Sequence, residues 1–239
     1  EDGYACCEWI GHGGAGHFVK MVHNGIEYAD MQMISEAYNL MLNLLKLSTD
    51  EMQQIFLDWN KGDLKSYLIE ITSHILGVKD SDTGKPLIDL ILDTAEQKGT
   101  GKWTGQTSLD LGAPAMTITD AVFIRMLSSL KNERVEASKV LNGPTKKINV
   151  NENEFIEMIR RALFCSKICS YAQGFQLLKI ADNEYKWELN YGNIALLWRA
   201  GCIIRAQFLT KIRDAYLRNP EIKNLLLDIF FPKKCLNCG

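Results

Sequence analysis

The sequence has no long hydrophobic run and no excess of charge of either sign. None of its apolar segments reaches the roughly 18 residues that a membrane-spanning helix requires. Its 27 basic and 29 acidic residues give a net charge of −2, and no basic block of the kind that binds nucleic acid stands out. No secretory signal peptide is recognisable. We therefore expect a cytoplasmic protein that binds neither a membrane nor a nucleic acid.

A regular cysteine framework is also absent. The chain has seven cysteines, an odd number at irregular spacings, which is typical of a protein from a reducing compartment. Cys235 and Cys238 form a C-x-x-C, but they stand alone, whereas a structural zinc site requires four ligands. The pattern therefore predicts no metal site.

Strand signals are nearly absent after Ile10, and helical periodicity fills most of the chain instead. Helices are predicted over residues 16–45, 50–59, 64–76, 116–141, 152–179, 194–217 and 221–230. Long helices joined by short turns are typical of an all-helical domain. The sequence thus predicts an all-α fold, with one large multi-helix domain and a short remnant strand at the N-terminus.

The first predicted helix carries a polar stripe where a globular helix normally carries an apolar one. Residues at i, i+3, i+4, i+7 and i+8 share one helix face, and here they are Lys20, His23, Asn24, Glu27 and Tyr28. A separate apolar line on the same helix can pack on a core. The polar face is either a solvated surface, which is the commoner case, or the wall of a polar pocket.

Two features favour the pocket. Gly25 lies in mid-helix, where glycine costs about 1 kcal/mol relative to alanine and often marks a close contact with the backbone. The glycine-rich segment 11–16 precedes the helix, and backbone N–H groups at a helix N-terminus favour an anion. This segment also matches G-x-G-x-x-G, but the chain continues as helix where a dinucleotide-binding βαβ unit needs a second strand.

Read together, this loop and helix resemble the catalytic signature of the β-hydroxyacid dehydrogenase superfamily, through Gly11, Gly14, Gly16, Lys20 and Asn24. Further segments resemble one family within it, the decarboxylating 6-phosphogluconate dehydrogenases, in the family's order. Among them are QKGTGKWT at 97–104, SYAQGF at 170–175 and WRAGCIIR at 198–205. The similarity covers about residues 1–231.

The resemblance implies a domain organisation that extends beyond the chain. Members of the family have an N-terminal Rossmann domain that binds NADP, then a helical domain that holds most substrate contacts and the dimer interface. Only the helical domain is resembled here, over residues 11–231. Residues 1–10 are expected to form the strand that links the two domains, and residues 232–239 diverge from the family. We find no counterpart of the arginine and histidine that the family's C-terminal tail supplies to the neighbouring subunit.

The resemblance also implies roles for individual residues. Lys20 corresponds to the general base at the C3 hydroxyl of 6-phosphogluconate, and Glu27 corresponds to the general acid. His23 and Asn24 correspond to residues that orient the substrate and the coenzyme, so that Asn24 is also a possible NADP contact. The remaining positions, assigned to the substrate phosphate, are Tyr28, Lys98, Thr100 and Arg125.

Three functions remain open at this point. The leading one is NADP-dependent oxidative decarboxylation of 6-phosphogluconate to ribulose 5-phosphate, in the pentose phosphate pathway and gluconate utilization. A homodimer would carry it out, with this chain as its substrate and catalytic domain. The alternative is a catalytically inert fragment that folds, dimerises and at most binds a sugar phosphate. A third is a related dehydrogenase with an unphosphorylated substrate, which Lys98, Thr100 and Arg125 disfavour.

Overall fold

A computed structural model of the chain describes residues 5–143 and 150–236. Within these ranges the protein consists of ten α-helices and three short 3-10 or π segments, with no sheet, so the all-α prediction is confirmed. The elements are α1 Ala15–Leu40, η1 Met41–Leu45, α2 Thr49–Trp59, α3 Tyr67–Leu76, η2 Leu87–Leu90, α4 Thr100–Asp110, α5 Met116–Ser129, α6 Lys131–Val140, α7 Glu152–Tyr185, α8 Tyr191–Leu197, α9 Leu209–Arg218, η3 Leu225–Leu227 and α10 Phe231–Leu236.

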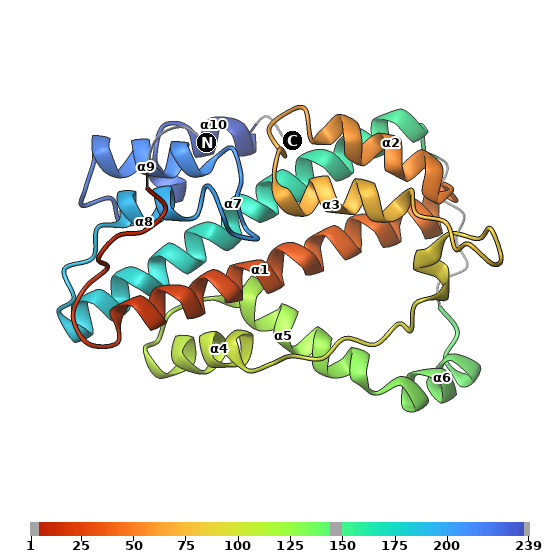
Figure 1. The fold of residues 1–239 in the computed structure, drawn as a ribbon, viewed down its shortest axis with the longest axis horizontal. Helices are drawn as coiled ribbons and strands as arrows, with labels where there is room; N and C mark the ends of the chain where they lie inside the picture. The colour runs from red at the N-terminus through yellow and green to blue at the C-terminus, as the bar shows by residue number, and fades with distance from the viewer. Residues whose placement is uncertain (1–4, 144–149, 237–239) are drawn as a thin grey trace.

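The two longest helices, α1 and α7, form the centre of the fold and lie side by side (Figure 1). They approach closely at Gly174, where a Cβ atom would lie 2.5 Å from the Cδ1 atom of Ile26. Val22 and Ile26 of α1 and Leu177 and Leu178 of α7 are fully buried in the core. Helices α4 and α5 pack on α1, and α8 packs with α9 near the end of α7 (Figure 1).

The starts of several helices follow their sequence signals. Ser48 begins α2 with a capping box, in which its side chain and that of Glu51 each bond to the other's backbone N–H. Ser66 accepts from the Ile69 N–H at the start of α3, and Asn151 accepts from the Glu154 N–H at the start of α7. Such caps satisfy backbone N–H groups that have no partner within the helix.

The single helix predicted over residues 116–141 is wrong, because the chain breaks at Leu130 and forms α5 and α6 instead. The backbone angles of Leu130 are φ −81° and ψ 51°, which lie outside the helical region. The Ser128 carbonyl accepts hydrogen bonds from the guanidinium of Arg134 at 3.0 and 3.2 Å. A side chain thus occupies a carbonyl that a continuous helix would pair with a backbone N–H.

The helix predicted over residues 194–217 is also interrupted, between α8 and α9. Residues in this gap pair with the chain around the start of α3: Tyr67 N–H donates to the Arg205 carbonyl and Gln207 N–H to that of Lys65. The helix predicted over 221–230 is reduced to η3, because the buried Asp228 binds Arg218 and turns the chain. In each case a tertiary contact overrides local helical periodicity.

The N-terminal strand is not formed over residues 5–10. A strand needs a neighbour for its backbone N–H and C=O groups, and the described ranges contain no sheet for it to join. Trp9 is correspondingly 74% exposed. Residues 1–4 of the predicted strand and Cys238 of the C-x-x-C lie outside the described residues. No described helix is both long and apolar enough to cross a bilayer.

Candidate functional site

The polar stripe predicted on α1 exists, and Asn24 is the residue that connects its members. The Asn24 Oδ1 atom accepts a hydrogen bond from Lys20 Nζ at 2.8 Å and lies 3.0 Å from His23 Nδ1. Its Nδ2 atom donates to Thr100 Oγ1 at 2.9 Å. Because both ends of the amide are engaged, its orientation is fixed. The lysine, the imidazole and the start of α4 are therefore held around one side chain.

His23 is a buried imidazole whose Nδ1 atom faces two polar neighbours. Nδ1 lies 3.0 Å from Asn24 Oδ1, which can only accept a hydrogen bond, and 3.4 Å from Lys20 Nζ, which can only donate one, so its role depends on the tautomer. Burial first, and then the charge of Lys20, lower the pKa of His23 to about 4, against a weaker upward effect of Asn24. Its Nε2 atom is buried and has no partner in the described structure. The ring packs edge-on against Trp198, with 5.8 Å between centroids.

Glu27 lies one turn beyond His23 on the same face. Its Oε2 atom is 3.8 Å from His23 Nδ1, and its side chain is only 14% exposed. Burial raises the pKa of Glu27, while the positive charges of Lys20 and Arg125 act in the opposite direction. Glu27 is thus easier to protonate than a carboxyl group in water, which suits a group that exchanges a proton.

Gly25 lies where α4 crosses α1. A Cβ atom at Gly25 would lie 2.6 Å from the Cγ2 atom of Thr104 and 2.9 Å from that of Ile118, so no larger residue fits without movement. Thr104 Oγ1 lies 2.8 Å from the Met21 carbonyl and 2.9 Å from the Thr100 carbonyl. The mid-helix glycine therefore marks a close contact, as predicted, and this contact brings Thr100 to the α1 face.

Tyr28, Arg125 and the segment before α4 meet at the far end of the polar face. The guanidinium carbon of Arg125 lies 4.2 Å from the centroid of the Tyr28 ring, a cation–π arrangement. Lys98 donates to the Tyr28 hydroxyl through its backbone N–H at 3.4 Å, while its side chain is exposed. A Cβ atom at Gly101 would lie 2.5 Å from the Tyr28 ring. Gly99, with φ 114°, takes a backbone conformation that favours glycine.

The structure therefore brings the predicted residues together from three places: α1, the start of α4 and α5. The contacts form two groups, one around Asn24 and one around Tyr28, which are adjacent on α1. Thr100 is the first residue of α4, so its position adds the partial positive charge of a helix N-terminus to the Tyr28 group. Helix α4 itself was not predicted, because its two glycines and its polar residues mask the periodicity.

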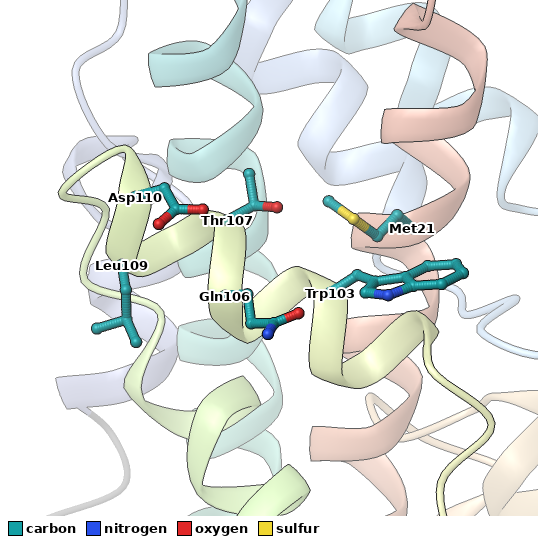
Figure 2. Close-up of a pocket in the computed structure, with 6 residues that line it drawn as sticks. All are labelled: Met21, Trp103, Gln106, Thr107, Leu109 and Asp110. Atoms are coloured by element: carbon teal, nitrogen blue, oxygen red, sulfur yellow. The ribbon is translucent and has the colours of Figure 1, made fainter.

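A hollow of about 460 Å³ opens beside Lys20 and Thr100. Its other walls are largely aromatic or apolar and include Phe18, Met21, Trp103, Tyr185 and Trp187. A second hollow of about 540 Å³ shares Met21, Trp103 and Thr107 and continues along α4. Figure 2 shows the Met21 and Trp103 side chains next to one another where α1 and α4 meet. Lys20 thus lies at the edge of a hollow whose other walls are largely apolar or aromatic.

Trp198 and Cys202 reach the site, although neither was predicted from the sequence as a site residue. Trp198 is 5% exposed and covers His23. Cys202 Sγ donates to the Trp198 carbonyl at 2.9 Å. Burial raises the pKa of Cys202. The positive charge of Lys20 lowers this pKa, and the charge of Glu27 raises it. The signal that could have located them is the segment 198–205, one of those that carried the family resemblance.

The described residues contain no group of three or more His, Cys, Asp or Glu side chains placed to hold a metal ion. What the arrangement offers is an amine, a carboxyl group whose pKa is raised by burial, and an amide that fixes the position of the amine. Beside them lie groups of the kinds that can bind an anion: the Tyr28 hydroxyl, the Arg125 guanidinium, the Thr100 hydroxyl and the start of α4. Such a site can bind a small anionic substrate and move protons on it.

Residues 16–238 match the family described as 6-phosphogluconate dehydrogenase, C-terminal domain. Among curated proteins, the NADP(+)-dependent, decarboxylating 6-phosphogluconate dehydrogenase of Bacillus subtilis is 59% identical over 96% of this chain and 49% of its own length. The human decarboxylating 6-phosphogluconate dehydrogenase is 59% identical over 99% of this chain and 49% of its own. The chain thus spans about half the length of these relatives.

A solved structure of Plasmodium falciparum 6-phosphogluconate dehydrogenase is similar over the whole chain. It superimposes with a TM-score of 0.96 at 45% sequence identity and covers 100% of this chain and 52% of that one. The Plasmodium protein is known in its apo form, in complex with its cofactor NADP+ and in complex with its substrate 6-phosphogluconate. At this identity, the likeness extends to both sequence and fold.

Proposed function

Because the chain belongs to the 6-phosphogluconate dehydrogenase family, we propose that it supplies the substrate-binding and catalytic domain of such an enzyme. The proposed reaction is the NADP-dependent oxidative decarboxylation of 6-phosphogluconate to ribulose 5-phosphate, a step of the pentose phosphate pathway. Residues 11–231 form this domain. The observation that carries the proposal is the Asn24 side chain, which joins Lys20 to Thr100 and so links the proton-transfer group to the anion-binding group.

In the proposed reaction, Lys20 is the general base for the C3 hydroxyl of the substrate. Asn24 holds its Nζ atom from one side and keeps the amine at the mouth of the hollow. Glu27 is the general acid that returns a proton to the neighbouring carbon after CO₂ has left. The two groups lie seven residues apart on α1, about 10 Å of helix rise, so their long side chains can reach adjacent carbons of one substrate.

The substrate phosphate is proposed to bind at the Tyr28 end of the site. Arg125 supplies a planar cation that can bond two phosphate oxygens at once, and the Tyr28 hydroxyl and Thr100 hydroxyl supply further donors. Lys98 lies beside them with an exposed side chain, and we propose that its ammonium group also binds the phosphate. His23 and Asn24 orient the sugar chain between the two ends. These contacts favour a phosphorylated substrate over an unphosphorylated one.

NADP, when bound, supplies the hydride acceptor. Since the chain spans about half the length of its curated relatives, we propose that residues outside it bind most of the coenzyme. Within the chain, we propose that a flat ring of the coenzyme lies in the apolar hollow beside Lys20, and that Asn24, which bonds to the lining residues Lys20 and Thr100, contacts it.

The test is a pair of substitutions in the full-length protein. Lys20→Met removes the base while keeping a long side chain, so kcat should fall by about 100-fold or more with KM for 6-phosphogluconate changed only a few-fold. Arg125→Met should instead raise KM for 6-phosphogluconate. A Lys20→Met enzyme with undiminished kcat contradicts the assignment of the base, and an Arg125→Met enzyme with unchanged KM contradicts the phosphate site.

The length of the chain also supports a second candidate, a domain that binds 6-phosphogluconate but has no activity by itself. Two measurements on this chain separate the candidates: calorimetric titration with 6-phosphogluconate, and NADPH formation in the presence of NADP. Binding without turnover supports the second candidate, and measurable turnover removes it.

We further propose that the protein is a homodimer and that α5 and α6 contribute to its interface. Phe123 and Leu127 of α5, and Leu130 at the break between α5 and α6, are 59%, 54% and 48% exposed. A solvent-exposed apolar strip of this extent is typical of an interaction surface.

Sedimentation tests the proposed dimer. It should give a dimer for the wild-type chain and a monomer for Phe123→Glu/Leu127→Glu. A control, Leu217→Glu on α9, changes a residue that is 70% exposed and should leave the dimer intact. A monomeric wild type contradicts the proposal.

A further inference from the structure

The segment between η2 and α4 has no regular secondary structure, yet it leads into the proposed phosphate site. Residues 92–98 form neither helix nor strand, and they run along α5 on their way to α4 (Figure 1). Lys98 and Thr100 lie at the end of this segment. Because no helix or sheet bonds fix its backbone, its position depends on the contacts that it makes with neighbouring elements.

Arg125 of α5 is held by this segment. Its Nη1 atom donates to the Glu96 carbonyl at 2.7 Å, while the guanidinium stacks on the Tyr28 ring. Its Nη2 atom lies 3.8 Å from the sulfur of Met31, which is a weak acceptor. A guanidinium has five N–H donors, so Arg125 retains donors for a phosphate in the described structure. The Glu96 carbonyl therefore helps to decide where this guanidinium lies.

Arg134 of α6 joins the start of the segment to the end of α5. Its Nη2 atom donates to the Asp93 carbonyl at 2.7 Å, and its Nη1 atom donates to Asp93 Oδ2 at 3.3 Å. Its Nε and Nη2 atoms donate to the Ser128 carbonyl at 3.2 and 3.0 Å. Each nitrogen of this guanidinium thus has an acceptor within the protein, and the side chain clamps two pieces of backbone together.

Ser128 makes a second contact with the segment. Its hydroxyl accepts from the Ala95 N–H at 3.0 Å, and it lies three residues after Arg125, about one helical turn. Arg125, Ser128 and Arg134 line one hollow of about 520 Å³. The break at Leu130, which periodicity did not predict, therefore brings Arg134 back against the end of α5 and against the segment beside it.

We propose that Arg134 is a positioning residue for the phosphate site. By clamping Asp93 to Ser128, it sets the register of the segment along α5, and the register sets the Glu96 carbonyl that holds Arg125. The inference rests on the proposed function, in which Arg125 binds the substrate phosphate. The competing explanation is direct attraction of the phosphate by the Arg134 charge. The clamp requires the forked geometry of a guanidinium, whereas attraction requires only a positive charge.

The test is the affinity of the full-length protein for 6-phosphogluconate and for gluconate, measured by calorimetric titration. Arg134→Met should lower the affinity for 6-phosphogluconate by about 5-fold or more, with little change for gluconate and a kcat close to that of the wild type. Arg134→Lys keeps the charge but cannot reproduce the fork, so it should lose as much. An Arg134→Lys protein with the wild-type affinity for 6-phosphogluconate overturns the proposal, because charge alone would then suffice.

A second variant tests the same register without changing any charge. Ser128→Ala removes the hydroxyl that accepts from Ala95 and should also weaken binding of 6-phosphogluconate more than binding of gluconate. The matched control is Arg161→Met on α7, which removes a 40% exposed arginine that pairs with Glu157 at 2.8 Å. It should leave both affinities unchanged. A merely structural role for Arg134 would lower the unfolding free energy and leave the ratio of the two affinities unchanged, and this result also overturns the proposal.

Arg125→Met separates this inference from the proposed function. If Arg125→Met weakens binding of 6-phosphogluconate and Arg134→Met does not, the phosphate site stands and the clamp is wrong. If neither variant changes that affinity, the phosphate site itself is wrong.

Discussion

The side-chain amide of Asn24 donates to the hydroxyl oxygen of Thr100 at 2.9 Å, although 76 positions separate the two residues in the sequence. This bond ties the polar face of α1 to the first residue of α4. The opposite end of the same amide accepts from Lys20. The position of the Lys20 amine therefore depends on a residue of the end of the site that we propose binds the phosphate.

Removing the hydroxyl at Thr100 should impair catalysis without unfolding the protein. Thr100→Val keeps the shape of the side chain but leaves the Asn24 amide without its acceptor, so the amide is free to rotate away from Lys20. We expect kcat of the full-length enzyme to fall by about 10-fold, the loss of one hydrogen bond of about 1–1.5 kcal/mol. Thr100→Ser, which keeps the hydroxyl, is the matched control and should remain close to wild type. Equal activities of Thr100→Val and Thr100→Ser would show that the bond does not matter.

Adding one methyl group at Gly25 should destabilise the chain. Its new Cβ would meet Thr104 and Ile118 at 2.6 and 2.9 Å, and overpacking of this kind costs about 1–3 kcal/mol. Gly16→Ala on the same helix is the control, since no atom lies within 4 Å of its new Cβ. Urea unfolding at neutral pH measures both. Gly16→Ala should be neutral or slightly stabilising because alanine favours helix. A Gly25→Ala variant as stable as the Gly16→Ala variant would refute the close crossing of α1 and α4.

The stability of the chain should decrease on acidification in a window set by His23. Its folded pKa is lowered from 6.5 to about 4, so the folded state binds fewer protons than the unfolded state between these values. The contribution that His23 makes to the free energy of unfolding by staying neutral is fully present above about pH 6.5. It is lost as the pH falls toward 4. The expected loss approaches about 3 kcal/mol.

The measurement compares urea unfolding of two proteins from pH 7 to pH 4, one with His23 and one with His23→Gln. Both should carry Glu27→Gln, because the raised pKa of Glu27 acts in the opposite sense: it favours the folded state as the pH falls. The protein with His23 should lose more stability than the other across the window. Parallel curves would mean that His23 titrates normally.

A methyl group at Gly101 should weaken binding of the phosphate more than binding of the sugar. The added Cβ would lie 2.5 Å from the Tyr28 ring, so the ring must move and Arg125, which stacks on it, moves too. Gly105→Ala on the same helix is the control, because its nearest atom would lie at 3.6 Å, an ordinary contact. We expect Gly101→Ala to lower the affinity of the full-length protein for 6-phosphogluconate by about 10-fold. Its affinity for gluconate should change little. Equal losses for both ligands would place the phosphate elsewhere.

The sequence predicted most of this site because one helix carries it. The spacing of the α1 residues defines a face, and a mid-helix glycine indicates a close neighbour, so both features could be recognised locally. The family resemblance then supplied Lys98, Thr100 and Arg125, which lie far away in the sequence. Sequence alone did not identify Asn24 as the connection among them, since its amide is fixed by a bond to α4 that no local pattern encodes.

The errors in the predicted fold have the same origin. The break at Leu130 depends on the guanidinium of Arg134 occupying the Ser128 carbonyl, and the gap between α8 and α9 depends on backbone bonds to residues near Tyr67. Periodicity within a window cannot register such long-range contacts. Asp30 and Lys167 are a further case, since they lie 137 positions apart and neither residue alone indicates a buried ion pair.

The most direct test of the account is a crystal structure of the full-length protein with 6-phosphogluconate. The account predicts that the phosphate contacts Tyr28, Thr100 and Arg125. It also predicts that the sugar chain runs along α1, with the C3 hydroxyl within hydrogen-bonding distance of Lys20 Nζ and Glu27 beside the adjacent carbon. A ligand bound with its phosphate away from Arg125, or with C3 out of reach of Lys20, would contradict it.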